Sequence, residues 1–396
     1  VTSKLFLFSN PDPFFGPRGA VLARNPVKSA PILLDNAPFT SDAPDFALLT
    51  EQGGVGFVQL LLAQQNGMVQ PCAAPIQVGN HEFASERNPR DLLVGDFDGD
   101  HVPDMFVVNE GVSGGVVHHI VLGQQRPDPP LGEIVKVNAT TGAVQGRVAF
   151  LDGDDLLDII LVPQPELGGG APVQVLLSQP TALGQPAFVA MPELDFGSFA
   201  YEVIEVADLN GDGVMDISVA SGSELRVSTM LGNGDGTFVP EQSIEVSSIP
   251  FYGVADPSSP AVGLHSCQNG NRPSIALVLA GSVLGKQPAV AVLNQEFDGP
   301  SQAWALRPPT LLGVFVAPQF GEPIGKSLVA NIDEVGSVEM VLAVAGEPTV
   351  VSGGLLQFDR LDRGFRALDI ENADGSEVPV QVSDLVFATA FPGDSP

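Results

Sequence analysis

Acidic residues recur at a fixed spacing in short loops of this chain, and the spacing suits a metal ion. The two clearest loops carry oxygen-bearing side chains at loop positions 1, 3, 5 and 9, with glycine at position 4. These side chains are Asp96, Asp98, Asp100 and Asp104 in one loop, and Asp208, Asn210, Asp212 and Asp216 in the other. Alternate side chains of a tight loop surround one point, and glycine allows the sharp turn. Carboxylates this close repel one another without a cation, and hard oxygen ligands favour Ca²⁺ over Mg²⁺ or Zn²⁺.

The backbone carbonyls of Val102 and Val214 would add a fifth ligand to each of these loops. Weaker copies follow the same template with fewer ligands. One has Phe150 at position 1 and then Asp152, Asp154 and Asp158, and another has Asn331, Asp333 and Glu339. Two more, after Asp35 and Asp256, fit only with extra loop residues. For every loop, a solvated turn without a metal remains the alternative, and it gains weight as ligands are lost.

An EF-hand is the other loop that begins with this pattern. Its twelfth position needs a bidentate glutamate, but Val219 stands there in the loop that starts at Asp208. The residues after Asp216 also have the composition of a strand, so the EF-hand is disfavoured.

Apolar segments before and after each loop must position the ligands, and they predict strands. The loops begin near residues 35, 96, 150, 208, 256 and 331, which is a repeat of about 57 residues, the size of a four-stranded propeller blade. We therefore predict an all-β fold, a single-domain seven-bladed β-propeller of four-stranded antiparallel blades. The expected blades are residues 28–85, 86–142, 143–200, 201–250, 251–322 and 323–378, with 379–396 and 1–27 sharing the closing blade. Such sharing would close the ring and leave no free sheet edge there.

Composition narrows the function. The 47 acidic and 17 basic residues give a net charge of -30, which excludes nucleic acid as a partner. No apolar run reaches the roughly 18 to 20 residues of a membrane-spanning helix. The chain begins without a recognisable export signal, which would have been removed or never included. Cys72 and Cys267 cannot define a disulfide framework, and we expect them to be unpaired.

The motifs Asp-Phe-Asp-Gly-Asp-His-Val-Pro-Asp, Asp-Leu-Asn-Gly-Asp-Gly-Val-Met-Asp and Leu231-Gly-Asn-Gly-Asp-Gly-Thr-Phe238 resemble FG-GAP/VCBS repeats, the blades of integrin α-subunit propellers. The resemblance is strong over about residues 90–240. It implies structural calcium in loops that join the first two strands of a blade. It also implies an extracellular, periplasmic or cell-surface protein, a monomer that acts as an adhesion or protein-interaction scaffold for an unknown protein or surface ligand.

A glycan-binding propeller is the first alternative, although Trp304, Tyr201 and Tyr252 are too few for an aromatic platform in every blade. The second alternative is the catalytic or noncatalytic propeller of a secreted carbohydrate-active enzyme. We expect no enzyme, because the clustered carboxylates already serve the loops. The segment Gly111-Val-Ser113-Gly-Gly115 lacks the helix of a nucleophile elbow, and His118 and His119 should point to opposite faces of a strand. Function is expected where the repeat is broken, at Asp256–Arg272 and Gln295–Pro309.

Overall fold

The fold is seen in a computed structural model. It describes residues 2–7, 19–24, 26–32, 45–63, 69–72, 74–111, 115–124, 131–140, 142–163, 172–179, 181, 185–197, 201–221, 226–245, 261–269, 272–279, 289–298, 303–306, 310–314, 323–330, 339–344, 349–351 and 365–367. These residues form seven antiparallel sheets. The only helical element among them is one turn of 3₁₀ helix, Ala84–Glu86. No helix in this part of the chain is long and apolar enough to cross a membrane.

The first four sheets follow the chain in order. The first pairs β1 (Thr2–Leu7) with β2 (Gly19–Arg24). The second contains β3 (Pro26–Ile32), β4 (Asp45–Gln52), β5 (Val55–Ala63), β6 (Val69–Pro71) and β7 (Ile76–Val78). The third contains β8 (Pro89–Gly95), β9 (Asp104–Asn109), β10 (Val116–Gly123) and β11 (Leu131–Ala139). The fourth contains β12 (Gln145–Ala149), β13 (Asp158–Val162), β14 (Gln174–Gln179) and β15 (Ala187–Ala190).

The remaining three sheets continue the same meander. One contains β16 (Val203–Ala207), β17 (Asp216–Ser221), β18 (Arg226–Gly232) and β19 (Phe238–Glu245). The next contains β20 (Ala261–Asn269), β21 (Arg272–Leu279), β22 (Ala289–Asp298), β23 (Ala303–Leu306) and β24 (Thr310–Val314). The last contains β25 (Pro323–Ala330), β26 (Glu339–Val344), β27 (Thr349–Val351) and β28 (Phe365–Ala367).

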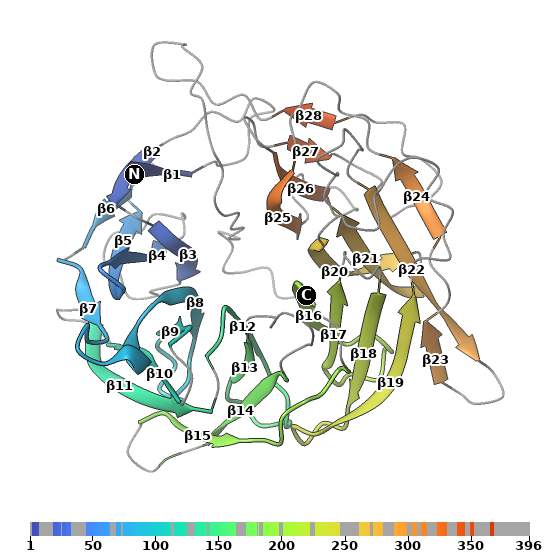
Figure 1. The fold of residues 1–396 in the computed structure, drawn as a ribbon, viewed down its shortest axis with the longest axis horizontal. Coiled ribbons are helices and arrows are strands. Elements are labelled where there is room, and N and C mark those ends of the chain that lie inside the picture. The colour runs from blue at the N-terminus through green and yellow to red at the C-terminus, as the bar shows by residue number, and fades with distance from the viewer. Residues whose placement is uncertain are drawn as a thin grey trace.

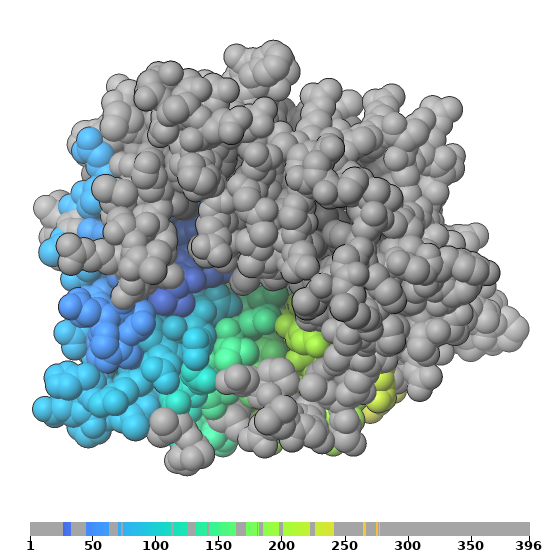
Figure 2. Space-filling view, turned by 45° about the horizontal axis from the view of Figure 1, so that its top comes forward, coloured from blue at the N-terminus to red at the C-terminus, as the bar shows by residue number. Residues whose placement is uncertain are grey.

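The sheets stand side by side around a central axis, with the first strand of each large sheet nearest the axis and the last strands outside (Figure 1). In the space-filling view, the described residues of neighbouring sheets form one continuous wall from blue to yellow-green (Figure 2). This arrangement confirms an all-β propeller of antiparallel blades. The predicted closing blade needs residues 379–396, which lie outside the described residues, so the number seven stays a prediction.

The hydrophobic core lies between blades, because strand side chains alternate between the two faces of each sheet. Val107 on β9 packs with Leu49 and Val58 of the preceding sheet. Its neighbour Phe106 packs with Ile159 and residues of the following sheet. The strands that follow the loops, β9, β13 and β17, are buried at every residue, which explains why their apolar runs are nearly continuous rather than alternating.

The predicted insertion Asp256–Arg272 is wrong for Ala261–Asn269, which form strand β20. This strand pairs with β21 in a register that includes Ser266 opposite Ile275, so it is the first strand of its blade and not a loop insertion. In the second break of the repeat, Trp304 lies in β23 opposite Phe297. Both segments extend the sheet instead of leaving it.

Candidate metal centre

Each acidic loop joins the first strand of a blade to the second, as the repeat predicts. The residue before loop position 1 pairs with the residue at position 9: Gly95 with Asp104, Ala149 with Asp158, and Ala207 with Asp216. Glu339 opens β26 in the same way opposite Ala330, whereas Asn331 and Asp333 lie outside the described residues. Position 9 is therefore the first residue of the second strand in each case.

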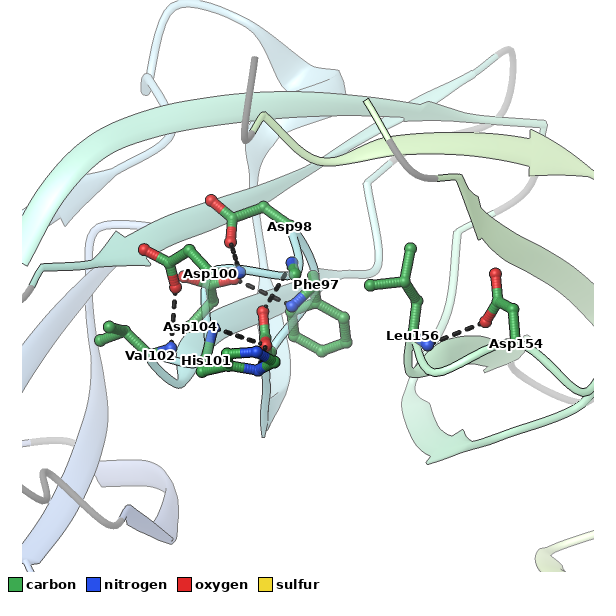
Figure 3. Close-up of polar contacts among 10 residues, drawn as sticks. Phe97, Asp98, Asp100, His101, Val102, Asp104, Asp154 and Leu156 are labelled. Atoms are coloured by element: carbon green, nitrogen blue, oxygen red, sulfur yellow. Dashed lines mark hydrogen bonds and ion pairs between the residues drawn. The ribbon is translucent and has the colours of Figure 1, made fainter. Parts of the chain in front are cut away.

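The loop from Asp96 to Asp104 brings its carboxylates together (Figure 3). Oxygens of Asp96, Asp98 and Asp104 all lie within 4.8 Å of one another, and they are the only such acidic group found in the described part of the chain. Asp96 accepts hydrogen bonds from the backbone N–H of Gly99 at 2.8 Å and of His101 at 2.8 Å. These bonds curl the loop around its own first carboxylate. Three hard oxygen donors at this separation fit a divalent cation.

Positions 3 and 5 stabilise the loop in the same manner. Asp98 accepts from the N–H of Asp100 at 3.1 Å, and Asp100 accepts from the N–H of Val102 at 2.7 Å. Gly99 has φ +79°, which glycine adopts without a steric penalty, and His101 also has a positive φ of +65°. The predicted ligand Asp100 thus points toward Val102, outside the group formed by the other three carboxylates.

The carboxylate at position 9 has a second task that the sequence did not reveal. One oxygen of Asp104 accepts from the N–H of Phe97 at 3.0 Å and the other from the N–H of Gly123, on the third strand, at 2.8 Å. Asp158 makes the same two bonds with Leu151 at 2.8 Å and Ser178 at 2.9 Å. Each of these carboxylates ties the start of the loop to the end of the third strand.

The third copy repeats this joint: Asp216 accepts from Leu209 at 2.8 Å and from Gly232 at 2.9 Å. The side chains of Asp104, Asp158 and Asp216 are buried, at 1%, 0% and 0% exposure. A Cβ at Gly232 would lie 2.2 Å from the carbonyl oxygen of Met215, so this blade needs glycine there, whereas Ser178 makes the equivalent bond in its own blade. A glycine or serine at the end of the third strand was the available signal for the joint.

Burial is the main reason why the pKa values of these three carboxyl groups are raised. It raises the pKa of Asp104 to about 7, against the opposing effect of its two N–H donors, and the charges of Asp98 and Asp100 raise it further. Burial likewise raises the pKa of Asp158 and of Asp216 to about 6. A cation beside Asp104 would replace the proton as its counter-charge.

The loops differ in how well they are equipped for an ion. In the loop after Ala207, Asp208 accepts from the N–H groups of Gly211 at 2.7 Å and Gly213 at 2.9 Å, and the amide of Asn210 donates to Asp212 at 2.9 Å. In the loop after Ala149, Asp152 and Asp154 keep their turn bonds, but position 1 is Phe150, whose side chain is 50% exposed. The first of the three loops thus has the most convergent donors.

Replacing Phe150 by aspartate is expected to create a cation site in the incomplete loop. The exposed ring can be removed without opening the core, and the new carboxylate would stand where Asp96 stands in its own loop. Calcium should then raise the Tm of the variant by about 5 °C more than that of the parent. Differential scanning fluorimetry with and without calcium measures this, with Phe83→Asp, at another exposed phenylalanine, as the matched control. Equal calcium responses of the two variants would show that the loop cannot hold an ion.

Comparison with known proteins shows that other proteins share this fold. No protein-family model and no curated protein sequence matches the chain. A solved structure of the periplasmic gluconolactonase PpgL from Pseudomonas aeruginosa matches with a TM-score of 0.50 and 15% identity, over 86% of this chain and 85% of that one. The propeller is a shared fold. A protein from Lactobacillus plantarum matches with a TM-score of 0.45, at 9% identity, over 85% and 81% of the two chains. The GH43_1 enzyme from Xanthomonas citri, complexed with xylose, matches with a TM-score of 0.32, at 12% identity, over 72% and 91%.

The prediction that the chain is not an enzyme is contradicted by this likeness. The gluconolactonase, an enzyme by name, has the same fold over most of both chains, so the propeller gives no reason to exclude catalysis. The prediction considered the loop carboxylates, the serine motif and the two adjacent histidines, and it did not consider the charged residues on the strands nearest the axis. The other objections to specific sites stand. Residues 116–123 after the serine motif form strand β10, and His118 and His119 are buried on opposite faces of it.

Proposed function

We propose that this protein is a β-propeller enzyme that hydrolyses a sugar-derived substrate, with a sugar lactone as the substrate class. The observation that supports this proposal is the fold shared with a periplasmic gluconolactonase over 86% of the chain. Carbohydrate chemistry was also the second alternative from the sequence. The likeness favours it over an adhesion scaffold, for which the described residues offer no corresponding support.

The cation in this proposal is calcium, and its role is structural. The converging oxygens of Asp96, Asp98 and Asp104 are hard donors in a flexible loop, which suits calcium better than magnesium or zinc. The loop lies where two strands of one blade meet the third, so an ion there would stiffen the blade rather than take part in the reaction.

Three further features complete the proposal. The protein works outside the cytoplasm as a monomer, its ring has seven blades, and its loops are FG-GAP/VCBS repeats. The net charge of -30 gives solubility and repels anionic polymers, which fits a small neutral substrate better than a polyanionic one.

The test is hydrolysis of δ-gluconolactone and related sugar lactones, followed by proton release in weakly buffered solution and corrected for the spontaneous rate. The purified protein should accelerate the reaction, with a kcat of about 1–1000 s⁻¹. Aryl xylosides and galactosides serve as a second substrate panel. Activity on the glycosides alone would replace the lactone by a glycoside, and no activity on either panel would contradict the proposed function.

A further inference from the structure

The first strands of successive blades lie nearest the axis (Figure 1), and charged side chains connect several of them. A carboxylate oxygen of Asp91 on β8 accepts from the N–H of Gly146 on β12 at 3.0 Å. Arg147 on β12 donates to the carbonyl oxygen of Ile204 on β16 at 3.4 Å. Glu205 on β16 accepts from the N–H of Ser266 on β20 at 2.8 Å. Each side chain thus reaches from one blade to the next.

Three of the side chains on these strands combine chemical reactivity with access. Arg147, Glu205 and His265 lie on β12, β16 and β20, which are the first strands of three consecutive blades. Each residue is only partly buried. By contrast, His118 and His119 are 0% and 1% exposed, and no ligand can touch them in this fold. Arg147 and Glu205 also occupy the same place in the repeat, three residues before loop position 1.

The three groups also act on one another electrically. Burial raises the pKa of Glu205, while its bond with Ser266 and the charge of Arg147 oppose the rise. Burial and the same charge of Arg147 lower the pKa of His265 to about 4, so this imidazole is neutral near pH 7. The contacts agree with this: Arg147 reaches the carbonyl oxygen of Ile204, next to Glu205, and Glu205 reaches the N–H of Ser266, next to His265. The guanidinium has five N–H groups, and within the described residues two of its bonds go to the carbonyl oxygens of Gly146 and Ile204.

We propose that Arg147, Glu205 and His265 form the catalytic centre of this protein, at the inner edges of three neighbouring blades. The inference rests on the proposed function and names its site. It separates the reaction from the acidic loops, which hold the blades together. The substrate class is a sugar lactone, whose ester carbonyl needs a base to activate water and a cation to stabilise the oxyanion.

The reaction that these groups support is balanced as follows. Glu205 takes a proton from water while the water oxygen bonds to the carbonyl carbon of the lactone, and the resulting oxyanion lies beside Arg147. The bond between that carbon and the ring oxygen then breaks, and the proton on Glu205 goes to the ring oxygen. The product is the open hydroxy acid, with the elements of one water added. His265, neutral near pH 7, completes the site next to Ser266, whose N–H donates to Glu205.

The decisive variant is Glu205→Gln, because glutamine still accepts the hydrogen bond from Ser266 but cannot take the proton. We expect kcat for δ-gluconolactone to fall roughly 100-fold or more with little change in KM. The Tm should remain within a few degrees of the parent. Glu133→Gln, on the exposed outer strand β11, is the matched control and should keep full activity. Arg147→Lys keeps the charge but loses the fork of donors, and should weaken binding of D-gluconate at least tenfold by calorimetry.

The outcomes separate this site from the proposed function. Lactone hydrolysis that survives Glu205→Gln would overturn the site and leave the function intact. A parent protein that binds D-gluconate without hydrolysing lactones, and loses that binding in Arg147→Lys, would support the site and overturn the hydrolase. Neither hydrolysis nor binding by the parent would overturn both.

Discussion

Replacing Asp158 by alanine is expected to lower the free energy of unfolding by about 2–5 kcal/mol, because two buried N–H groups would lose their only acceptor in the joint. These groups belong to Leu151 and Ser178, at 2.8 and 2.9 Å from the carboxylate. The loop of Asp158 has Phe150 at position 1, so loss of a bound cation contributes least to the effect here. Urea unfolding followed by circular dichroism gives the free energy.

Asp155→Ala is the matched control for this measurement. Asp155 lies in the same loop, three residues earlier, but is exposed. Its removal should change the free energy of unfolding by less than about 0.5 kcal/mol. If the two variants were equally stable, the carboxylate at position 9 would not be the joint between loop and third strand.

Calcium is expected to raise the Tm more at pH 8 than at pH 5. Burial raises the pKa of Asp104 from 3.8 to about 7, so the fold favours the protonated group when no cation is bound. The contribution of that group to stability is complete below about pH 4 and is lost as the pH rises through 7. At about 1.4 kcal/mol per pKa unit, the loss is at most about 4 kcal/mol. At pH 5 the proton neutralises the group, whereas at pH 8 calcium is needed.

The comparison with and without calcium must be made at each pH. Burial lowers the pKa of His118 to about 3, and burial and Arg147 lower that of His265 to about 4. The stability that these two neutral imidazoles give the fold is therefore lost as the pH falls below about 6.5, whether or not calcium is present. The calcium-dependent difference cancels this term. In Asp98→Asn, which removes one oxygen of the converging group, the difference between pH 8 and pH 5 should shrink. Equal calcium shifts at both pH values in the parent would contradict a cation beside Asp104.

The sequence predicted the repeated part of the fold well because the pattern within each repeat determines its strands and the turn between them. Around residues 92–108, an apolar run, the acidic loop and a second apolar run together fix two paired strands and the turn between them. The same reasoning failed at Asp256, where a lone carboxylate matched the template without positions 3 and 5. Strand β20 begins beyond it, and its pairing with β21 depends on partners that no local pattern announces.

The candidate sites were predictable only where side chains carry the signal. The ligand spacing identified Asp96, Asp98 and Asp104, which the fold brings together. The joint at position 9 was not predicted because its partners are backbone N–H groups, one of them seven residues earlier and the other 16 to 20 residues later in the chain. The proposed centre of Arg147, Glu205 and His265 was not predicted, for another reason. Arg147 and His265 are far apart in sequence, on strands that are neighbours of β16 only in the ring of blades; the repeat position shared by Arg147 and Glu205 was a usable clue, and His265 lies in the predicted segment Asp256–Arg272.

Asp104, Asp158 and Asp216 each accept two backbone hydrogen bonds. Because these bonds do not involve the ion, the acidic motif has two separate functions, holding the blade in shape and binding the cation. In these three blades the same joint maintains the shape, while affinity for the ion depends on neighbouring residues that can change independently. Phe150 illustrates such drift, since its blade retains the joint after losing a ligand. A duplicated blade could thus accumulate substitutions at positions 1, 3 and 5 without collapsing, which gives a ring of near-identical units room to diversify one unit at a time.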